Sequence, residues 1–115
     1  MVEEIPPEAV KSKLEDKDVQ IIDTRSPQDY NNGHIPGAIN IPFAELPQRI
    51  DEVDWGEDVV VACPIGQSSV QAARLIESYE GVKDGATIAS MEGGYDQWEY
   101  ELERSEHKKT DEAPI

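Results

Sequence analysis

The sequence has little cysteine, few basic residues and no long apolar segment. Cys63 is the only cysteine among 115 residues, so an internal disulfide is excluded and nothing requires an oxidising compartment. Ten Lys and Arg residues stand against 25 Asp and Glu residues, and the formal net charge of -15 argues against a nucleic-acid backbone or an anionic membrane surface as partner. No segment approaches the roughly 20 apolar residues of a membrane span.

The first residues also lack a basic segment followed by an apolar run, which is the pattern of a secretion signal. Together with the single cysteine, this predicts a cytoplasmic protein. The acidic residues are spread over the whole chain rather than confined to a tail. This distribution is typical either of adaptation to high salt, where dense carboxylates keep a protein in solution, or of an ordinary acidic cytosolic protein.

The chain is long enough for one small folded domain with a real core, but not for two. We expect this domain to span residues 1–103. The remaining residues, 104–115, form a polar tail that is predicted to be disordered.

Strands and helices are predicted to alternate along the domain. Apolar or β-branched runs predict strands at residues 2–5, 19–23, 38–41, 58–62 and 86–89. Capping residues, prolines at first helical positions and apolar spacing predict helices at residues 6–15, 26–30, 43–50, 69–80 and 95–103. This alternation predicts an α/β protein whose mostly parallel sheet is covered by helices on both faces.

Cys63 lies between the predicted strand at residues 58–62 and the helix that begins near Ser69. The first backbone N–H groups of a helix are unpaired and carry partial positive charge, so this position stabilises a thiolate or a bound anion. Such a position is typical of a reactive cysteine. A lone cysteine after a valine run is more often a small buried hydrophobic residue, so its position alone leaves both interpretations open.

Asp23 ends the strand at residues 19–23, at the sheet edge where ligands gather in open parallel sheets. Asp23 and Arg25 are therefore site candidates by position and by type. They are equally typical of a structural ion pair that ties the following loop to the sheet. His34 lies in a turn-rich segment without a second His or Cys at metal-ligand spacing, so we predict a structural role for it and no metal site.

Four stretches of the sequence resemble motifs of the rhodanese family, in particular of its single-domain sulfurtransferases, and they follow one another in the family's order. The first is Asp23-Thr24-Arg25 with Asp29-Tyr30, and the second is residues 33–39 together with the segment that continues to Pro42. The third is the Cys63 loop with its helix, and the fourth is Gly93-Gly94 followed by Trp98. The resemblance implies a rhodanese-like three-layer α/β fold with a five-stranded, mostly parallel sheet and helices on both faces. It also implies a cysteine that carries sulfane sulfur as a persulfide.

The Cys63 loop resembles the serine form found in single-domain thiosulfate enzymes, with four residues between the cysteine and Ser68. The loop has no arginine, so its backbone N–H groups, serine hydroxyls and helix end are expected to bind a sulfonate or persulfide. Tyrosine phosphatases and arsenate reductases need an arginine where this chain has Ser69, which argues against that class. The expected substrate-binding loop consists of Pro64, Ile65, Gly66, Gln67, Ser68 and Ser69.

These features predict a thiosulfate sulfurtransferase-like enzyme with Cys63 as the catalytic nucleophile and with Asp23 and Arg25 supporting the site from behind. The expected partners are a small sulfane donor and a thiol or cyanide acceptor, with a protein donor or acceptor as a further option. Neither a metal nor an organic cofactor is expected, and neither is a nucleic acid or a membrane. The alternative is a rhodanese-like sulfur-relay or partner-binding module with little activity on free thiosulfate.

Overall fold

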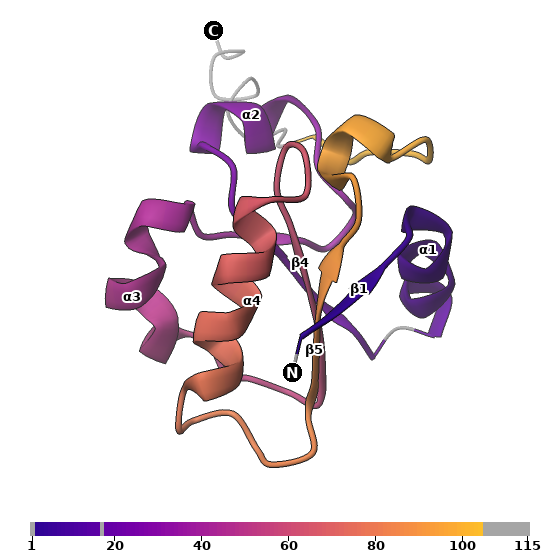
Figure 1. The fold of residues 1–115 in the computed structure, drawn as a ribbon. Helices are drawn as coiled ribbons and strands as arrows, with labels where there is room; N and C mark the ends of the chain where they lie inside the picture. Colours follow the sequence, from indigo (N-terminus) through magenta and orange to yellow (C-terminus); the bar gives the residue numbers. More distant parts are fainter. Residues whose placement is uncertain (1, 17, 105–115) are drawn as a thin grey trace, which may run out of the picture.

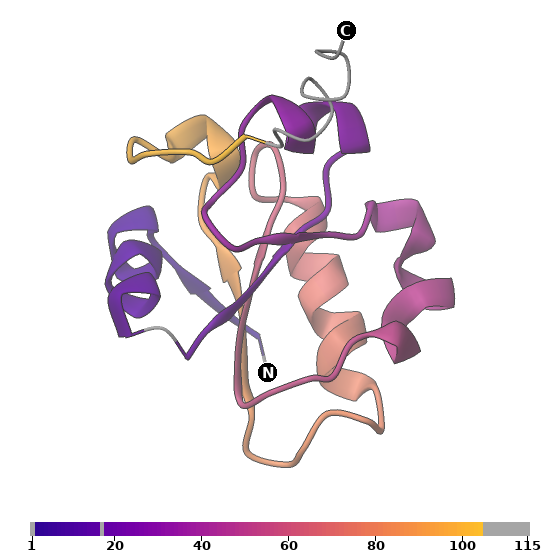
Figure 2. The same cartoon turned by 180° about the vertical axis from the view of Figure 1, so that it is seen from behind.

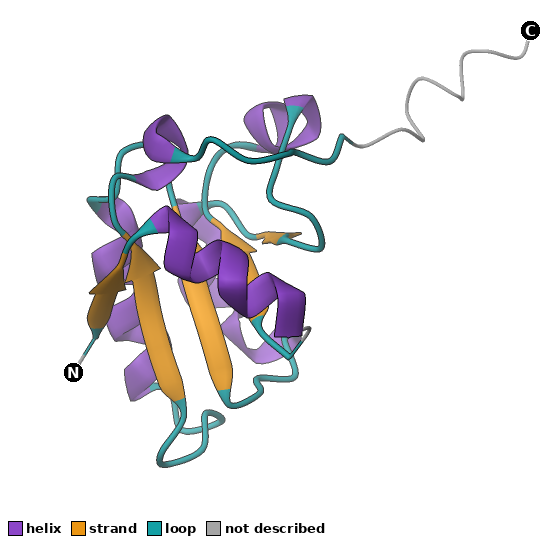
Figure 3. Ribbon diagram, turned by 90° about the vertical axis from the view of Figure 1, so that its right-hand side faces the viewer, coloured by secondary structure: helices purple, strands orange, loops and turns teal. Residues whose placement is uncertain are grey.

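The computed structural model describes residues 2–16 and 18–104, and its centre is a five-stranded sheet (Figure 1). The strand order is β1-β5-β4-β2-β3, and all neighbouring strands are parallel. The arrows of the longer strands accordingly point the same way in Figure 3. The predicted α/β fold is confirmed. The strands are β1 (Glu3–Ile5), β2 (Gln20–Asp23), β3 (Ile39–Asn40), β4 (Asp58–Ala62) and β5 (Thr87–Met91).

Helices cover both faces of the sheet, with α3 and α4 on one side and α1 on the other (Figures 1 and 2). The four α-helices are α1 (Pro7–Asp16), α2 (Pro27–Asn32), α3 (Leu46–Arg49) and α4 (Ser68–Ser78). The short 3₁₀ helices are η1 (Phe43–Glu45), η2 (Ile50–Glu52) and η3 (Gly94–Gln97). Within the described part of the chain, no helix has the length and apolar character needed to cross a membrane.

The central strand β4 is buried on both faces because its side chains alternate between two apolar layers. Val59 and Val61 pack in the layer that contains α4, whereas Val60 and Ala62 pack in the layer that contains Val10 of α1. All five side chains are fully buried. The valine run at this position therefore anchors the strand that leads directly into Cys63.

The carboxyl ends of β2 and β4 are tied together just before the Cys63 loop. The backbone N–H and the hydroxyl of Thr24 both donate to the carbonyl of Ala62, at 3.0 and 3.1 Å. The loop after β2 therefore lies beside the loop after β4, at the edge where parallel sheets collect their ligands.

The predicted helix over residues 95–103 is wrong. Only the single turn of η3 forms, and Glu103 then pairs with His34 in an antiparallel bridge through N–H···O bonds of 2.8 and 2.7 Å. Leu102, one of the apolar residues whose spacing predicted this helix, is 47% exposed. The apolar spacing is present, but the backbone groups of this segment bind a distant loop instead of each other.

Smaller differences concern the ends of elements. Helix α4 ends at Ser78, two residues before the predicted stop at Glu80-Gly81, and Leu75 on this helix is 37% exposed. Trp55 is buried in the core. Apart from Arg104, the tail with His107 lies outside the described residues, so its disorder stays a prediction.

The layered core predicts different effects for two leucine truncations. Leu46→Ala empties a fully buried position at the start of α3 and should lower the free energy of unfolding by about 2–5 kcal/mol. Leu75→Ala, at a partly exposed position of α4, should cost less than about 1 kcal/mol. Urea unfolding of both variants measures the difference, and equal losses would contradict this placement of the core.

Candidate active site

The thiol of Cys63 is fully buried in a cradle of backbone N–H groups at the end of β4. Its Sγ accepts hydrogen bonds from the N–H of Gly66 at 3.0 Å and from the N–H of Ser69 at 3.3 Å. Ser69 is the second residue of α4, so the first turn of that helix directs an otherwise unpaired N–H at the sulfur. Gly66 has a φ of +88°, which lets the loop turn its N–H inward.

Hydrogen bonds lower the pKa of the Cys63 thiol even though the thiol is buried. Burial alone raises this pKa, but the hydroxyls of Ser69 and Ser68 and the N–H groups of Ser69 and Gly66 lower it by more. The pKa therefore lies below the ordinary value of a cysteine thiol. All these donors are neutral, so partial charges and dipoles stabilise the anion without a cation.

Ser90 extends this cradle from the neighbouring strand β5. Its hydroxyl is fully buried and lies 2.7 Å from the hydroxyl of Ser69, which in turn lies 3.2 Å from Sγ of Cys63. Ser90 was not among the predicted site residues because the last strand was predicted to end at Ala89. The one available signal was a small polar residue beside an apolar strand.

The glycine turn at Gly93-Gly94 supports the loop from outside. The N–H of Tyr95 donates to the carbonyl of Cys63 at 2.8 Å, and the N–H of Asp96 donates to the carbonyl of Pro64 at 3.0 Å. Gly94 has a φ of +59°, and a Cβ on it would overlap the carbonyl oxygen of Cys63 and lie 2.7 Å from the nitrogen of Gly66. Only glycine fits this contact.

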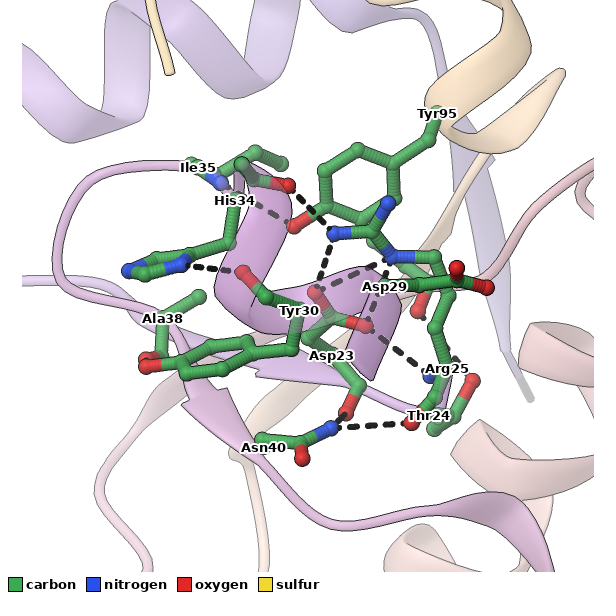
Figure 4. A network of polar contacts seen from close by, with 12 residues as sticks. Asp23, Thr24, Arg25, Asp29, Tyr30, His34, Ile35, Ala38, Asn40 and Tyr95 are labelled. Carbon is green, nitrogen blue, oxygen red and sulfur yellow. Dashed lines mark hydrogen bonds and ion pairs between the residues drawn. The ribbon is translucent and has the colours of Figure 1, made fainter. Parts of the chain in front are cut away.

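Asp23 and Arg25 form an ion pair beside the ring of Tyr95 (Figure 4). Asp23 is fully buried and accepts from Nε and Nη2 of Arg25, at 3.1 and 2.9 Å, and from the backbone N–H of Arg25 at 2.9 Å. Nη2 of Arg25 also donates to the carbonyl of Gly33 at 2.7 Å. The carboxylate of Asp23 thus receives charge-assisted hydrogen bonds from Arg25, as a buried carboxylate requires.

Tyr95 connects this ion pair to the Cys63 loop. The guanidinium of Arg25 lies 3.5 Å from the centroid of the Tyr95 ring, and the Tyr95 hydroxyl accepts from the N–H of Ile35 at 3.0 Å (Figure 4). Burial and the charge of Asp23 raise the pKa of Tyr95 well above its usual range, so the phenol stays neutral. Since the backbone of Tyr95 holds Cys63, Arg25 reaches the loop through Tyr95. Sequence reasoning missed this role because it placed Tyr95 on a helix.

The family is decided by a sequence profile, described as the rhodanese-like domain, which matches residues 6–101. The chain belongs to the rhodanese-like family. Thiosulfate sulfurtransferase GlpE of Shewanella oneidensis is 38% identical over 84 residues, which cover 73% of this chain and 79% of that protein. The crystal structure of a rhodanese-like domain protein from Staphylococcus aureus superposes with a TM-score of 0.75 and 29% identity, covering 90% and 99% of the two chains. The predicted family and fold are confirmed.

Another relative is longer than this rhodanese-like domain. The putative sulfur carrier protein YrkF of Bacillus subtilis is 34% identical over 77 residues, which cover 66% of this chain and 42% of YrkF. The chain therefore spans less than half the length of that relative.

His34 of this rhodanese-like domain is buried away from the thiol. Its ring stacks on Tyr30, with centroids 3.8 Å apart, and its Nδ1 lies 2.8 Å from the carbonyl of Tyr30. Its Nε2 lies 3.4 Å from a carboxylate oxygen of Glu103. Among residues 2–16 and 18–104, no group of three or more His, Cys, Asp or Glu side chains is arranged to hold a metal ion.

The outer surface of the Cys63 loop consists of Pro64, Ile65 and Gln67, all exposed, with Ile65 at 58%. Gly66 and Ser68 are half-buried, and Ser69 is buried. The predicted loop residues therefore divide into an inner set that binds the sulfur and an outer set that faces solvent.

Two glycine substitutions separate the effect of the contact between Gly94 and the Cys63 loop from the effect of placing an alanine at a positive φ. Gly85→Ala places an alanine at a φ of +91° in open space and should cost about 1–3 kcal/mol of stability. Gly94→Ala adds an overlap with the carbonyl of Cys63, so it should cost more and also change the rate at which iodoacetamide alkylates Cys63. Urea unfolding and alkylation kinetics check both variants. An unchanged alkylation rate in a folded Gly94→Ala variant would contradict the contact.

Proposed function

We propose that this rhodanese-like domain is a sulfurtransferase in which Cys63 takes sulfane sulfur from a donor such as thiosulfate and passes it to a thiophilic acceptor. The observation that carries the proposal is the Cys63 thiol itself, held by N–H and O–H donors that lower its pKa. A relative named thiosulfate sulfurtransferase adds support.

The first step loads sulfur onto Cys63. Its thiolate attacks the outer sulfur of thiosulfate, the sulfur–sulfur bond of the donor breaks, and sulfite leaves with the bonding electron pair. A Cys63 persulfide anion remains. The N–H groups of Gly66 and Ser69, which hold the thiolate, are placed to hold the terminal sulfur of this anion as well.

The second step unloads the sulfur. Cyanide, a small thiolate or the thiolate of a partner protein attacks the terminal sulfur, and Sγ of Cys63 leaves as a thiolate. The same donors stabilise the leaving group, so the cradle serves both steps. Neither step needs a metal or an organic cofactor.

Asp23 and Arg25 are proposed to support the loop without touching the substrate. The charge of Arg25 is neutralised by the buried carboxylate of Asp23, and its guanidinium is covered by the ring of Tyr95. It is therefore poorly placed to attract a dianion, and its contribution is to keep Tyr95 against the carbonyl of Cys63.

A sulfur-relay module that is loaded by a protein donor is the second candidate. Residues 63–69 contain no basic side chain, and the net charge of -15 repels a dianion such as thiosulfate. The relative YrkF is named a putative sulfur carrier protein, which supports this alternative. Both candidates use a Cys63 persulfide and differ only in the donor.

The first test is thiocyanate formation from thiosulfate and cyanide. Wild-type protein should be active, and Cys63→Ser should lose all activity because a serine hydroxyl is a poor nucleophile at neutral pH. Ser78→Ala, at an exposed hydroxyl on the last turn of α4, should keep full activity as a matched control.

Inactive but folded wild-type protein would contradict the thiosulfate reaction. Mass spectrometry after incubation with thiosulfate or with a cysteine desulfurase then identifies the donor that adds one sulfur atom to Cys63. No addition from either donor would contradict sulfur transfer through Cys63 altogether.

Salt should accelerate the thiosulfate reaction. The Debye length falls from about 10 Å at 0.1 M to about 3 Å at 1 M salt, so repulsion between the acidic domain and the dianion is screened. We expect kcat/KM for thiosulfate to rise with KCl, whereas alkylation by neutral iodoacetamide should change little. A flat profile for thiosulfate would contradict electrostatic control of the encounter. Unfolding midpoints in the same salt series test the high-salt hypothesis, while the cytoplasmic location stays a prediction.

A further inference from the structure

The side chains of Cys63, Ser69 and Ser90 form a short hydrogen-bond chain that starts at the sulfur and ends on the sheet. Cys63 follows β4, Ser69 lies in the first turn of α4 and Ser90 lies on β5. Sγ and the Ser69 hydroxyl are 3.2 Å apart, and the two serine hydroxyls are 2.7 Å apart. All three residues are fully buried, so water does not compete for these contacts.

The number of protons decides which group donates in each hydrogen bond of this hydrogen-bond chain. When Cys63 is protonated, the three side chains carry three protons for two hydrogen bonds. Sγ–H then donates to Ser69, Ser69 donates to Ser90, and the Ser90 proton has no further acceptor among the described hydrogen bonds. When Cys63 releases its proton to solvent, two protons remain for two bonds. Ser90 then donates to Ser69, and Ser69 donates to the thiolate, so every remaining proton is used.

We propose that Ser90 is a positioning residue that holds the Ser69 hydroxyl as a donor to the Cys63 thiolate and thereby favours the ionised, reactive form of Cys63. Ser90 acts through Ser69 and does not touch the sulfur. The inference rests on the proposed role of Cys63 as the nucleophile. It adds a residue from a different strand to the cradle that the loop itself provides.

No charged group donates a hydrogen bond to Sγ of Cys63 among the described residues. The donors to Sγ among the described residues are neutral, and the charge of Arg25 is neutralised by Asp23. Strand β5 carries no ionisable side chain. The charged or titratable groups on or directly next to β2, β4, α4, β5 and η3 are Asp23, Glu57, Asp58, Arg74, Glu77, Tyr79, Glu92, Tyr95 and Asp96, and Arg25 is paired with Asp23. None of them accounts for the lowered pKa of Cys63: burial raises this pKa, and hydrogen bonds from Ser69, Ser68 and Gly66 lower it by more.

The test is the pH dependence of alkylation by iodoacetamide, which reports on one thiol because Cys63 is the only cysteine. Ser90→Ala should raise the apparent pKa of Cys63 by about half a unit to one unit, since Ser69 loses the group that orients its proton. Well below the pKa, alkylation should therefore slow by about three- to tenfold, while the plateau rate at high pH changes little. A purely structural role would lower stability without moving this pKa.

Two comparisons make the result specific. Ser69→Ala should raise the apparent pKa at least as much, and adding Ser90→Ala should then have no further effect because the two residues act in series. Thr24→Val removes another buried hydroxyl at the same end of the sheet, one that binds the carbonyl of Ala62, and should leave the apparent pKa unchanged. Should Ser90→Ala not fold, Ser90→Thr and Ser90→Val form a pair of equal shape that differs in the hydroxyl, and only the valine should shift the pKa.

The inference is overturned if folded Ser90→Ala alkylates with the wild-type profile, or if its shift persists in the Ser69→Ala background. An equal shift in Thr24→Val would also overturn it. Alkylation requires no sulfur donor, so its outcome is separate from that of sulfur transfer. Loss of the thiocyanate reaction in wild-type protein, with the Ser90 shift present, would contradict the proposed function and leave the hydrogen-bond chain standing.

Discussion

The contact between the Cys63 loop and the turn at Gly94 determines which groups face the sulfur. The carbonyls of Cys63 and Pro64 accept hydrogen bonds from η3, so these acceptors point away from Sγ. The N–H groups of Gly66 and Ser69 are left on the inner side, where they surround the sulfur. A loop with its carbonyls turned inward would repel an anion, and the close backbone contact at Gly94 prevents this.

A strongly acidic chain can stabilise an anion here because the site uses dipoles instead of cations. The net charge is -15, yet the partners of Sγ are neutral, and the nearby guanidinium of Arg25 is neutralised by Asp23. Dipoles fixed by the backbone act only over short distances, so the thiolate is stabilised locally while the surface remains negative. Stability of the nucleophile and attraction of the substrate are therefore governed by different parts of the molecule.

The parts predicted from the sequence are those fixed by neighbouring residues. The valines of β4, the Ser26 cap of α2 and the position of Cys63 between a strand and a helix all follow from local patterns. The parts that were missed depend on residues far apart in the chain. Glu103 pairs with His34 in place of continuing a helix, and the bond between Ser69 and Ser90 joins a helix to a strand. Local periodicity carries no information about such partners.

The pairing of β1 with β5 sets the order in which the molecule can be completed on the ribosome. Glu3 lies opposite Ala89 and Ile5 opposite Met91, so β1 stays unpaired until residues 87–91 have been synthesised. Tyr95, whose N–H fixes the carbonyl of Cys63, emerges later still. A nascent chain therefore carries its only cysteine without the finished cradle around it, and the thiol acquires its protected, anion-binding environment only when the last elements of the domain leave the exit tunnel.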